Sequence, residues 1–188
     1  MNLNQAMAKY NFLGGHEKAQ FFLDNLATFK TSKKFERLLV ETWQTAETGQ
    51  CPPFGLQDGR FPWIEAFLLA DSQKLIAAGE KLPSPNEEGK YVAYRGLPFG
   101  KELNVIGCSW TLSKERAIWF ATRNVRYFAG TGEVGFLPPT EPTLYRCEFK
   151  PEEIAFFSDS RNEAEIVIEP RRLPSIRSKR LTVERLSA

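Results

Sequence analysis

The stretch GCSWTLSKERAIWFATR, residues 107–123, has the pattern of a buried strand that runs directly into an amphipathic helix. Ser109 and Thr111 are two residues apart, so their hydroxyls would point to the same side of an extended strand. Ser113 is the predicted N-cap, because its side-chain oxygen can accept a hydrogen bond from the free amides of the first helical turn. The expected core-facing stripe of this helix consists of Ala117, Phe120, Ala121, Val125 and Phe128.

Trp119 falls outside this stripe and shares a second face of the predicted helix with Glu115 and Arg123. Two interpretations of Trp119 are open at this point. The side chain either lines a cleft or packs against a second layer of structure, as most tryptophans do.

The composition is that of a chain with a real core and no strong preference for polyanions. The 188 residues suit one domain with an appendage, or two very small domains. Hydrophobic residues make up 42% of the chain and aromatic residues 13%, and the formal net charge is +2.

The sequence also disfavours several classes of protein. No apolar run approaches the roughly 20 residues that cross a bilayer, and the N-terminus lacks a signal-peptide pattern. We therefore expect a cytoplasmic protein with no membrane partner. Cys51, Cys108 and Cys147 are odd in number and widely spaced, which disfavours a disulfide scaffold and a zinc site. His16 is the only histidine, so we expect neither a metal centre nor histidine-based catalysis.

The first part of the chain is predicted to be helical. Residues 1–16 are polar and expected to be loosely held. The apolar spacing predicts helices from Glu17, from Ser32 and across 64–76, with Gly79 just past the last of them. The Pro- and Gly-rich stretch 49–62 is expected to be a loop.

A charged segment with two prolines, residues 80–90, separates this helical part from one rich in strands. We therefore place a helical N-terminal region at 1–88 and a second region at 89–188. Strands are predicted at 91–96, 105–111, 143–149, 153–157, 164–169 and 181–186. A long loop is expected at 129–142 and a turn at 158–162. Because strands outnumber helices in the second region, the predicted fold class is α+β.

Two carboxylates open the strand near residue 165. Glu163 and Glu165 would lie on one face, about 6.6 Å apart at ~3.3 Å per residue, and would repel each other. Either this face is a solvent-exposed edge, or it lines a cleft where a carboxylate meets a developing cation. Arg95 ends an apolar strand, where its guanidinium suits a phosphate or a strand-end salt bridge. Gly96 after it would let the backbone approach a ligand closely.

The order of these signals resembles the ADP-ribosyltransferase superfamily, in its arginine–serine–glutamate branch. Tyr94-Arg95-Gly96 is similar to its first motif, Ser109-Trp110-Thr111 to its Ser-Thr-Ser strand, and Glu163-Ala164-Glu165 to its Glu-x-Glu motif. The surrounding sequence is most similar to small phage and mobile-element members, such as the ADP-ribosylating anti-CRISPR proteins. The resemblance covers residues 91–170, which is less than half of the chain.

The resemblance implies a split β-sheet whose cleft binds NAD as co-substrate, with no metal. Arg95 would hold a phosphate or ribose of NAD, and the backbone of Gly96 would bind the carboxamide. Ser109 would orient the ribose and the catalytic glutamate, and Thr111 of the same motif would belong to the NAD site. Glu165 would bind the ribose 2′-hydroxyl and stabilise positive charge at C1′.

The resemblance also implies roles on the acceptor side and at the nicotinamide ring. Glu163 would position the acceptor, which in this family is classically an arginine side chain. Trp119 or Phe120 would stack on the nicotinamide.

The function that this resemblance implies is an NAD-dependent mono-ADP-ribosyltransferase that modifies a host protein or ribonucleoprotein, as a phage-encoded inhibitor of host defence in the host cytoplasm. The alternatives are an NAD glycohydrolase-type toxin, a catalytically silent binding module, and a transferase that targets RNA.

The end of the chain after Pro170 is basic, with Glu184 as its single acid. Such tails are often simply solvated, but they can also contact RNA. Its basic residues are Arg171, Arg172, Arg177, Lys179, Arg180 and Arg185.

Overall fold

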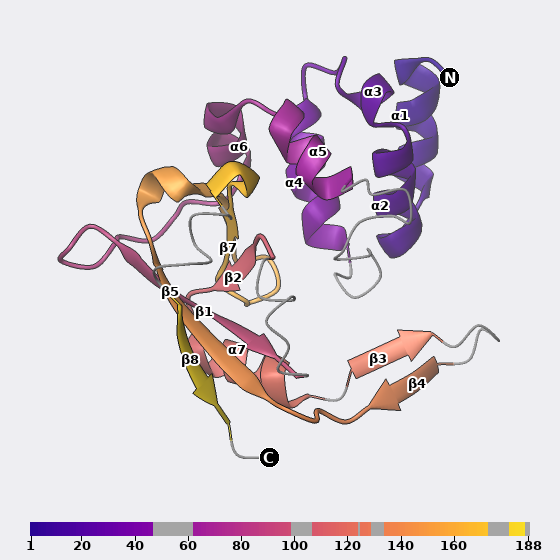
Figure 1. Cartoon of the computed structure of the whole chain (residues 1–188). Helices are drawn as coiled ribbons and strands as arrows, with labels where there is room; N and C mark the ends of the chain where they lie inside the picture. Colours follow the sequence, from indigo (N-terminus) through magenta and orange to yellow (C-terminus); the bar gives the residue numbers. More distant parts are fainter. Residues whose placement is uncertain (47–61, 99–106, 124, 129–133, 173–180, 187–188) are drawn as a thin grey trace. The chain divides into compact units, whose positions relative to one another are not determined.

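The computed structural model describes residues 1–46, 62–98, 107–123, 125–128, 134–172 and 181–186. The chain divides into two compact units, Met1–Glu80 and Lys81–Ala188. The division lies within the predicted linker, slightly before the expected boundary at 88/89, and whether each part is a domain that folds alone stays a prediction. Within the described residues, seven α-helices and a six-stranded antiparallel sheet confirm the α+β class (Figure 1).

The N-terminal unit contains six of these helices. They are α1 (Leu3–Phe12), α2 (Gly15–Asp24), α3 (Leu26–Phe29), α4 (Phe35–Thr45), α5 (Pro62–Leu69) and α6 (Ser72–Ala78).

The expectation that residues 1–16 are loosely held is wrong, because α1 is both capped and packed. The Asn2 side chain accepts from the backbone of Gln5, whose own side chain accepts from the Asn2 backbone, a reciprocal cap. Ala6 and Tyr10, one turn apart, are buried. These two side chains pack one face of this polar helix against the rest of the unit.

Two other helix predictions also need correction. The helix expected from Ser32 begins at Phe35. The single helix expected across 64–76 is two helices, because Asp71 caps α6 by accepting a hydrogen bond from Lys74 N at 3.0 Å. The predicted end of α6 at Gly79 is confirmed.

The core of the N-terminal unit is aromatic. Phe22 stacks on Phe29 with ring centroids 5.0 Å apart and on Phe35 at 6.0 Å. The buried Tyr10 ring contacts Phe29 edge-on, and its hydroxyl hydrogen-bonds to Thr42 Oγ1 at 2.7 Å. These rings join α1, α2, α3 and α4 into one cluster.

The second unit is built on a sheet with the strand order β6-β7-β2-β1-β5-β8, in which all neighbours are antiparallel. Its strands are β1 (Tyr91–Leu97), β2 (Ser109–Thr111), β5 (Thr143–Phe149), β6 (Ile154–Ser158), β7 (Glu165–Ile168) and β8 (Thr182–Arg185). Helix α7 (Lys114–Thr122) packs against β1 (Figure 1). Two short 3-10 helices, η2 (Pro151–Glu153) and η3 (Pro170–Arg172), adjoin the strands β6 and β7.

Helix α7 is shorter than its apolar stripe in the sequence predicted. The predicted cap is confirmed, since Ser113 Oγ accepts from Arg116 N at 3.1 Å. The helix ends at Thr122, however, and Val125–Phe128 forms strand β3, so the extension of the stripe to Val125 and Phe128 is wrong.

The loop expected at 129–142 is also wrong in part. It contains strand β4 (Val134–Leu137), which pairs with β3 as a separate two-stranded sheet. The predicted strand 105–111 is described only from residue 107 and is extended as β2 from Ser109. Cys51 and residues 49–61, 99–106, 129–133 and 173–180 lie outside the described residues.

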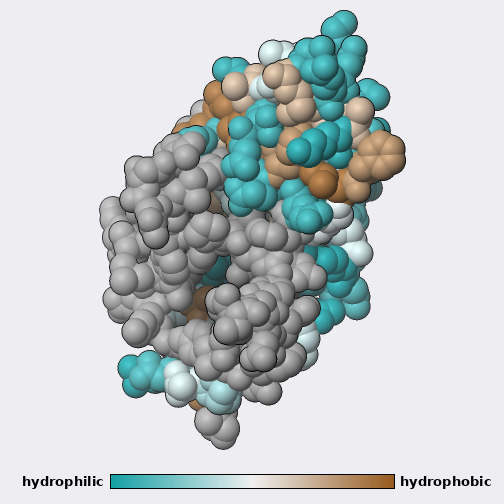
Figure 2. All heavy atoms as spheres, turned by 90° about the vertical axis from the view of Figure 1, so that its right-hand side faces the viewer, coloured by the Kyte–Doolittle hydropathy of each residue, from teal (hydrophilic) through white to brown (hydrophobic). Residues whose placement is uncertain are grey.

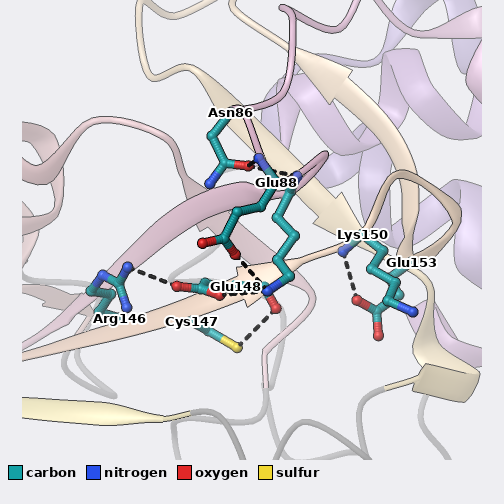
Figure 3. Close-up of polar contacts among 8 residues, drawn as sticks. Asn86, Glu88, Arg146, Cys147, Glu148, Lys150 and Glu153 are labelled. Carbon is teal, nitrogen blue, oxygen red and sulfur yellow. Dashed lines mark hydrogen bonds and ion pairs between the residues drawn. The ribbon is translucent and has the colours of Figure 1, made fainter.

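The segment before β1 is tied to β5 by polar contacts (Figure 3). Asn86 Oδ1 accepts from the backbone nitrogens of Glu88 and Lys90 and so fixes a turn. The Lys90 ammonium then pairs with Glu88 at 2.9 Å and with Glu148 of β5 at 3.3 Å. Glu148 also pairs with Arg146 of the same strand, so the start of β1 is held beside β5.

Apolar side chains on the surface of the N-terminal unit are dispersed. On the face in Figure 2, hydrophilic residues separate small apolar areas in its described part. Its exposed large apolar residues include Phe12, Leu68 and Ile76. None of the helices among the described residues is both long and apolar enough to cross a membrane.

Candidate active site

The structure brings together three residues that lie far apart in the sequence. Arg95 comes from β1, Ser109 from β2 and Glu165 from β7, which are neighbouring strands of the sheet. Arg95 Nη1 donates to the backbone oxygen of Ser109 at 2.5 Å. Ser109 Oγ in turn donates to Glu165 Oε1. A guanidinium, a hydroxyl-bearing residue and a carboxylate thus form one connected set.

Glu165 is buried in the middle of the sheet rather than on an exposed edge. Its strand lies between β6 and β2, and the residue is only 4% exposed. The interpretation of Glu165 as part of a solvated edge face is therefore wrong. A carboxylate is costly to bury unless hydrogen bonds or an opposite charge compensate it, and here Ser109 supplies such a bond.

Arg95 is half-buried, and the hydrogen-bonding capacity of its guanidinium is only partly used. Its Nε–H has no acceptor among the described residues, which is unusual for a buried donor. Burial lowers the pKa of Arg95, an effect that Cys108 and Glu165 oppose. No described residue forms an ion pair with Arg95, so the strand-end salt bridge is not found in this part of the chain. The donor set fits an anionic oxygen such as that of a phosphate.

Gly107 and Cys108 shape the surroundings of that guanidinium, and sequence reasoning gave neither a role. A Cβ on Gly107 would collide with the guanidinium group of Arg95, so this position has to be glycine for Arg95 to lie where it does. Burial raises the pKa of Cys108 to about 12, although Arg95 nearby opposes the shift. The thiol is therefore protonated at neutral pH and is not a ready nucleophile.

Thr111 has a structural use in this arrangement. Its hydroxyl donates to the backbone oxygen of Glu163 at 2.5 Å and accepts from Ser113 N at 3.1 Å. The side chain therefore ties β2 to the segment before β7 and to the start of α7. The predicted contact of Thr111 with NAD stays a prediction.

The two glutamates are held by an arginine that sequence reasoning missed. Arg161 Nη2 lies 3.0 Å from Glu163 Oε2 and 3.7 Å from Glu165 Oε2. Its cation compensates the like charges of the pair. The available signal was an arginine two and four residues before the glutamates, within the stretch 158–162 that is predicted as a turn.

The strand itself begins later than predicted. Strand β7 begins at Glu165, and Ala164 has a positive φ of 44°. Glu163 is therefore not part of the extended strand, and its expected alternation with Glu165 does not apply. The two carboxylates converge on Arg161 because the chain turns, not because they share one face of a strand.

Gly96 and the aromatic residues of α7 are not joined to the Arg95–Ser109–Glu165 set by any described contact. A Cβ on Gly96 would collide with the backbone oxygen of Ala117, so this glycine allows β1 to pack closely on α7. Trp119 is 46% exposed, which excludes packing beneath a second layer. Its ring lies 5.1 Å from that of Phe120, and the Arg123 guanidinium lies over both rings. Their predicted stacking on nicotinamide stays a prediction.

Comparison with known proteins does not identify the chain. No protein-family model matches it, and neither a curated protein nor a solved structure does. The function of the chain is therefore inferred from its residues and their geometry.

Proposed function

We propose that this chain is an NAD-dependent mono-ADP-ribosyltransferase that modifies a host macromolecule, and that its sheet forms an ADP-ribosyltransferase-like NAD cleft. The observation that carries the proposal is the buried carboxylate of Glu165, which accepts a hydrogen bond from Ser109 while Ser109 accepts one from Arg95. The three motifs in which these residues stand resemble those of that superfamily.

Glu165 supplies the main catalytic effect in this proposal. Loss of nicotinamide from NAD leaves positive charge on the ribose C1′, as in the transition state of glycoside hydrolysis. A carboxylate fixed beside that carbon binds the transition state more strongly than the ground state. Ser109 fixes one carboxylate oxygen, and burial weakens competition from water.

Arg95 and Ser109 hold and orient the substrate in this proposal. The Arg95 guanidinium, with a buried Nε–H that no described residue accepts, matches a phosphate or ribose oxygen of NAD. Its bond to the Ser109 backbone fixes β1 and β2 in the register that presents Ser109 Oγ to Glu165.

The acceptor side centres on Glu163. Its carboxylate lies beside that of Glu165 through their shared partner Arg161, so it can bind an acceptor and take its proton. Water in place of a macromolecular acceptor would make the chain an NAD glycohydrolase. The proposed target is a host protein or ribonucleoprotein, as in inhibition of host defence by phage. Exposed arginines such as Arg172 and Arg185 are candidate RNA contacts.

Release of nicotinamide from NAD tests this proposal. Glu165→Gln keeps the size and hydrogen-bonding capacity of the side chain but removes its charge, and we expect release to fall at least ~100-fold. Glu152→Gln, at an exposed carboxylate in η2, is the matched control and should release nicotinamide at the wild-type rate. A near-normal rate for Glu165→Gln would remove this residue from the mechanism.

Mass spectrometry of host lysate incubated with the protein and NAD then identifies the acceptor. A mass gain of one ADP-ribose unit on a host protein or RNA is the expected result. Release of nicotinamide without any labelled macromolecule would favour the glycohydrolase instead. No release at all would favour a binding module without catalysis.

A further inference from the structure

Arg161 places a guanidinium directly between the two carboxylates of the proposed site. Its Nη2 atom lies 3.0 Å from Glu163 Oε2 and 3.7 Å from Glu165 Oε2. Arg161 lies at the surface with its side chain 34% exposed, and its guanidinium contacts both carboxylates there.

The turn that carries Arg161 is fixed by hydrogen bonds on both sides. The backbone oxygen of Asp159 accepts from Asn162 N at 2.8 Å, and its carboxylate accepts from Ala164 N at 2.9 Å. Arg116 of α7 donates to the backbone oxygen of Asn162 at 2.8 Å. The guanidinium is thus presented to Glu163 and Glu165 by a braced loop, which lowers the entropic cost of holding it there.

We infer that Arg161 is a self-modification site, to which the chain transfers ADP-ribose from NAD. This inference rests on the proposed function. The ribose that Glu165 would bind has to lie next to this carboxylate, and Arg161 Nη2 lies 3.7 Å from its Oε2 atom. Glu163 holds the same nitrogen and is placed to accept its proton.

The step balances without any further reactant. A bond forms between a terminal nitrogen of Arg161 and C1′ of the ribose, while the bond between C1′ and the nicotinamide nitrogen breaks. Nicotinamide leaves with the bonding electron pair as a neutral molecule. The proton lost by the guanidinium passes to Glu163 and then to water, so the modified side chain keeps its positive charge.

The test is to incubate the purified full-length chain with NAD alone and to measure nicotinamide release and the mass of the protein together. Tandem mass spectrometry of its peptides should place one ADP-ribose on Arg161. Since donor site and acceptor lie in the same chain, the labelled fraction at a given time should not depend on protein concentration.

Arg161→Lys keeps the cation that compensates the two glutamates. We expect this variant to reduce the label at position 161 at least ~10-fold, because a lysine ammonium cannot reproduce the geometry of the guanidinium. Arg37→Lys, at an exposed position on α4, is the matched control and should leave the label unchanged. Nicotinamide release without label on Arg161, or label only on other residues, would overturn the inference and leave the proposed function standing. No nicotinamide release would overturn both.

Discussion

At the scale of single residues, Gly96 and Gly107 have different roles. Gly96 allows the sheet to pack on α7, whereas Gly107 leaves room for the side chain of Arg95 in the site. A Cβ on Gly96 would meet the backbone oxygen of Ala117, which can move only if β1 and α7 separate. We expect Gly96→Ala to lower the free energy of unfolding by about 1–3 kcal/mol, the usual cost of overpacking. Urea unfolding of the variant and the wild type measures this. An unchanged midpoint would mean that β1 and α7 do not pack this closely.

Gly107→Ala should leave the stability of the protein nearly unchanged but reduce its activity. The atoms that its Cβ would meet are the guanidinium end of Arg95, a flexible side chain that can move aside. We expect the free energy of unfolding to change by less than about 0.5 kcal/mol, as for most substitutions outside a rigid core. Nicotinamide release should fall at least ~10-fold, because Arg95 then leaves its bond to Ser109. Full release with a displaced Arg95 would remove this arginine from the site.

Tyr10 makes the stability of the N-terminal unit depend on pH in the alkaline range. Burial raises the pKa of Tyr10, and the hydrogen bond to Thr42 opposes the shift. The folded state therefore binds the phenolic proton more tightly than the unfolded state. The resulting stability is complete below the ordinary pKa of 10.0 and is lost as the pH rises through the raised value.

Tyr10→Phe tests this dependence. Below the ordinary pKa of Tyr10, the variant should be about 1 kcal/mol less stable, because it lacks the hydrogen bond to Thr42. Above it, the wild type should lose stability faster than the variant, so the difference narrows. Hydrogen exchange of the α1 and α4 amides as a function of pH measures both effects. Parallel pH curves for the two proteins would contradict the prediction.

At the scale of elements, the short helix α7 depends on its cap. Ser113 Oγ accepts from Arg116 N at 3.1 Å, and Ala117 and Ala121 are the buried residues of the helix. Alanines bury little apolar area, so the cap is a large part of what holds the helix. We expect Ser113→Ala to lower the stability of α7 by about 1 kcal/mol. Faster hydrogen exchange confined to α7 would show this, and unchanged exchange would contradict it.

The elements that the sequence predicted well are those whose pattern is local. The apolar stretch that became β5 and the cap of α7 at Ser113 could be predicted from spacing alone. The break at Asp71 could not, because the apolar spacing continues across it, and the break depends on hydrogen bonds of Asp71 to Lys74 and to Glu36 of α4. Likewise, Val125 and Phe128 fit the helical stripe, but pairing with β4, a contact set by the fold, made them part of a strand.

The candidate site, too, could be predicted from the sequence only in part. The order of Arg95, Ser109 and Glu165 suggested a common site, and the antiparallel pairing of their strands brings them into contact. Arg161 could not be predicted, since its position depends on the positive φ angles of Asn162 and Ala164. Such angles are uncommon for residues other than glycine, and although asparagine adopts them more often than most, nothing local favours one at Ala164.

At the scale of the whole molecule, all residues of the proposed site belong to one of the two units. Arg95, Ser109, Arg161, Glu163 and Glu165 lie within Lys81–Ala188. This unit also has its own core, since its strands bury a set of large apolar side chains. They are Phe149, Ile154, Phe156, Ile166, Val167 and Ile168.

We therefore expect residues 81–188, expressed alone, to fold and to release nicotinamide from NAD at a rate similar to that of the full chain. Cooperative unfolding in urea and a strand-rich circular dichroism spectrum would show that the shortened chain is folded. Residues 1–80 would then contribute to binding of the target macromolecule. In that case the shortened chain should label host macromolecules less than the full chain does, while it releases as much nicotinamide. A shortened chain that is folded but inactive would place part of the catalytic apparatus in the helical unit, where no motif of the proposed family is found.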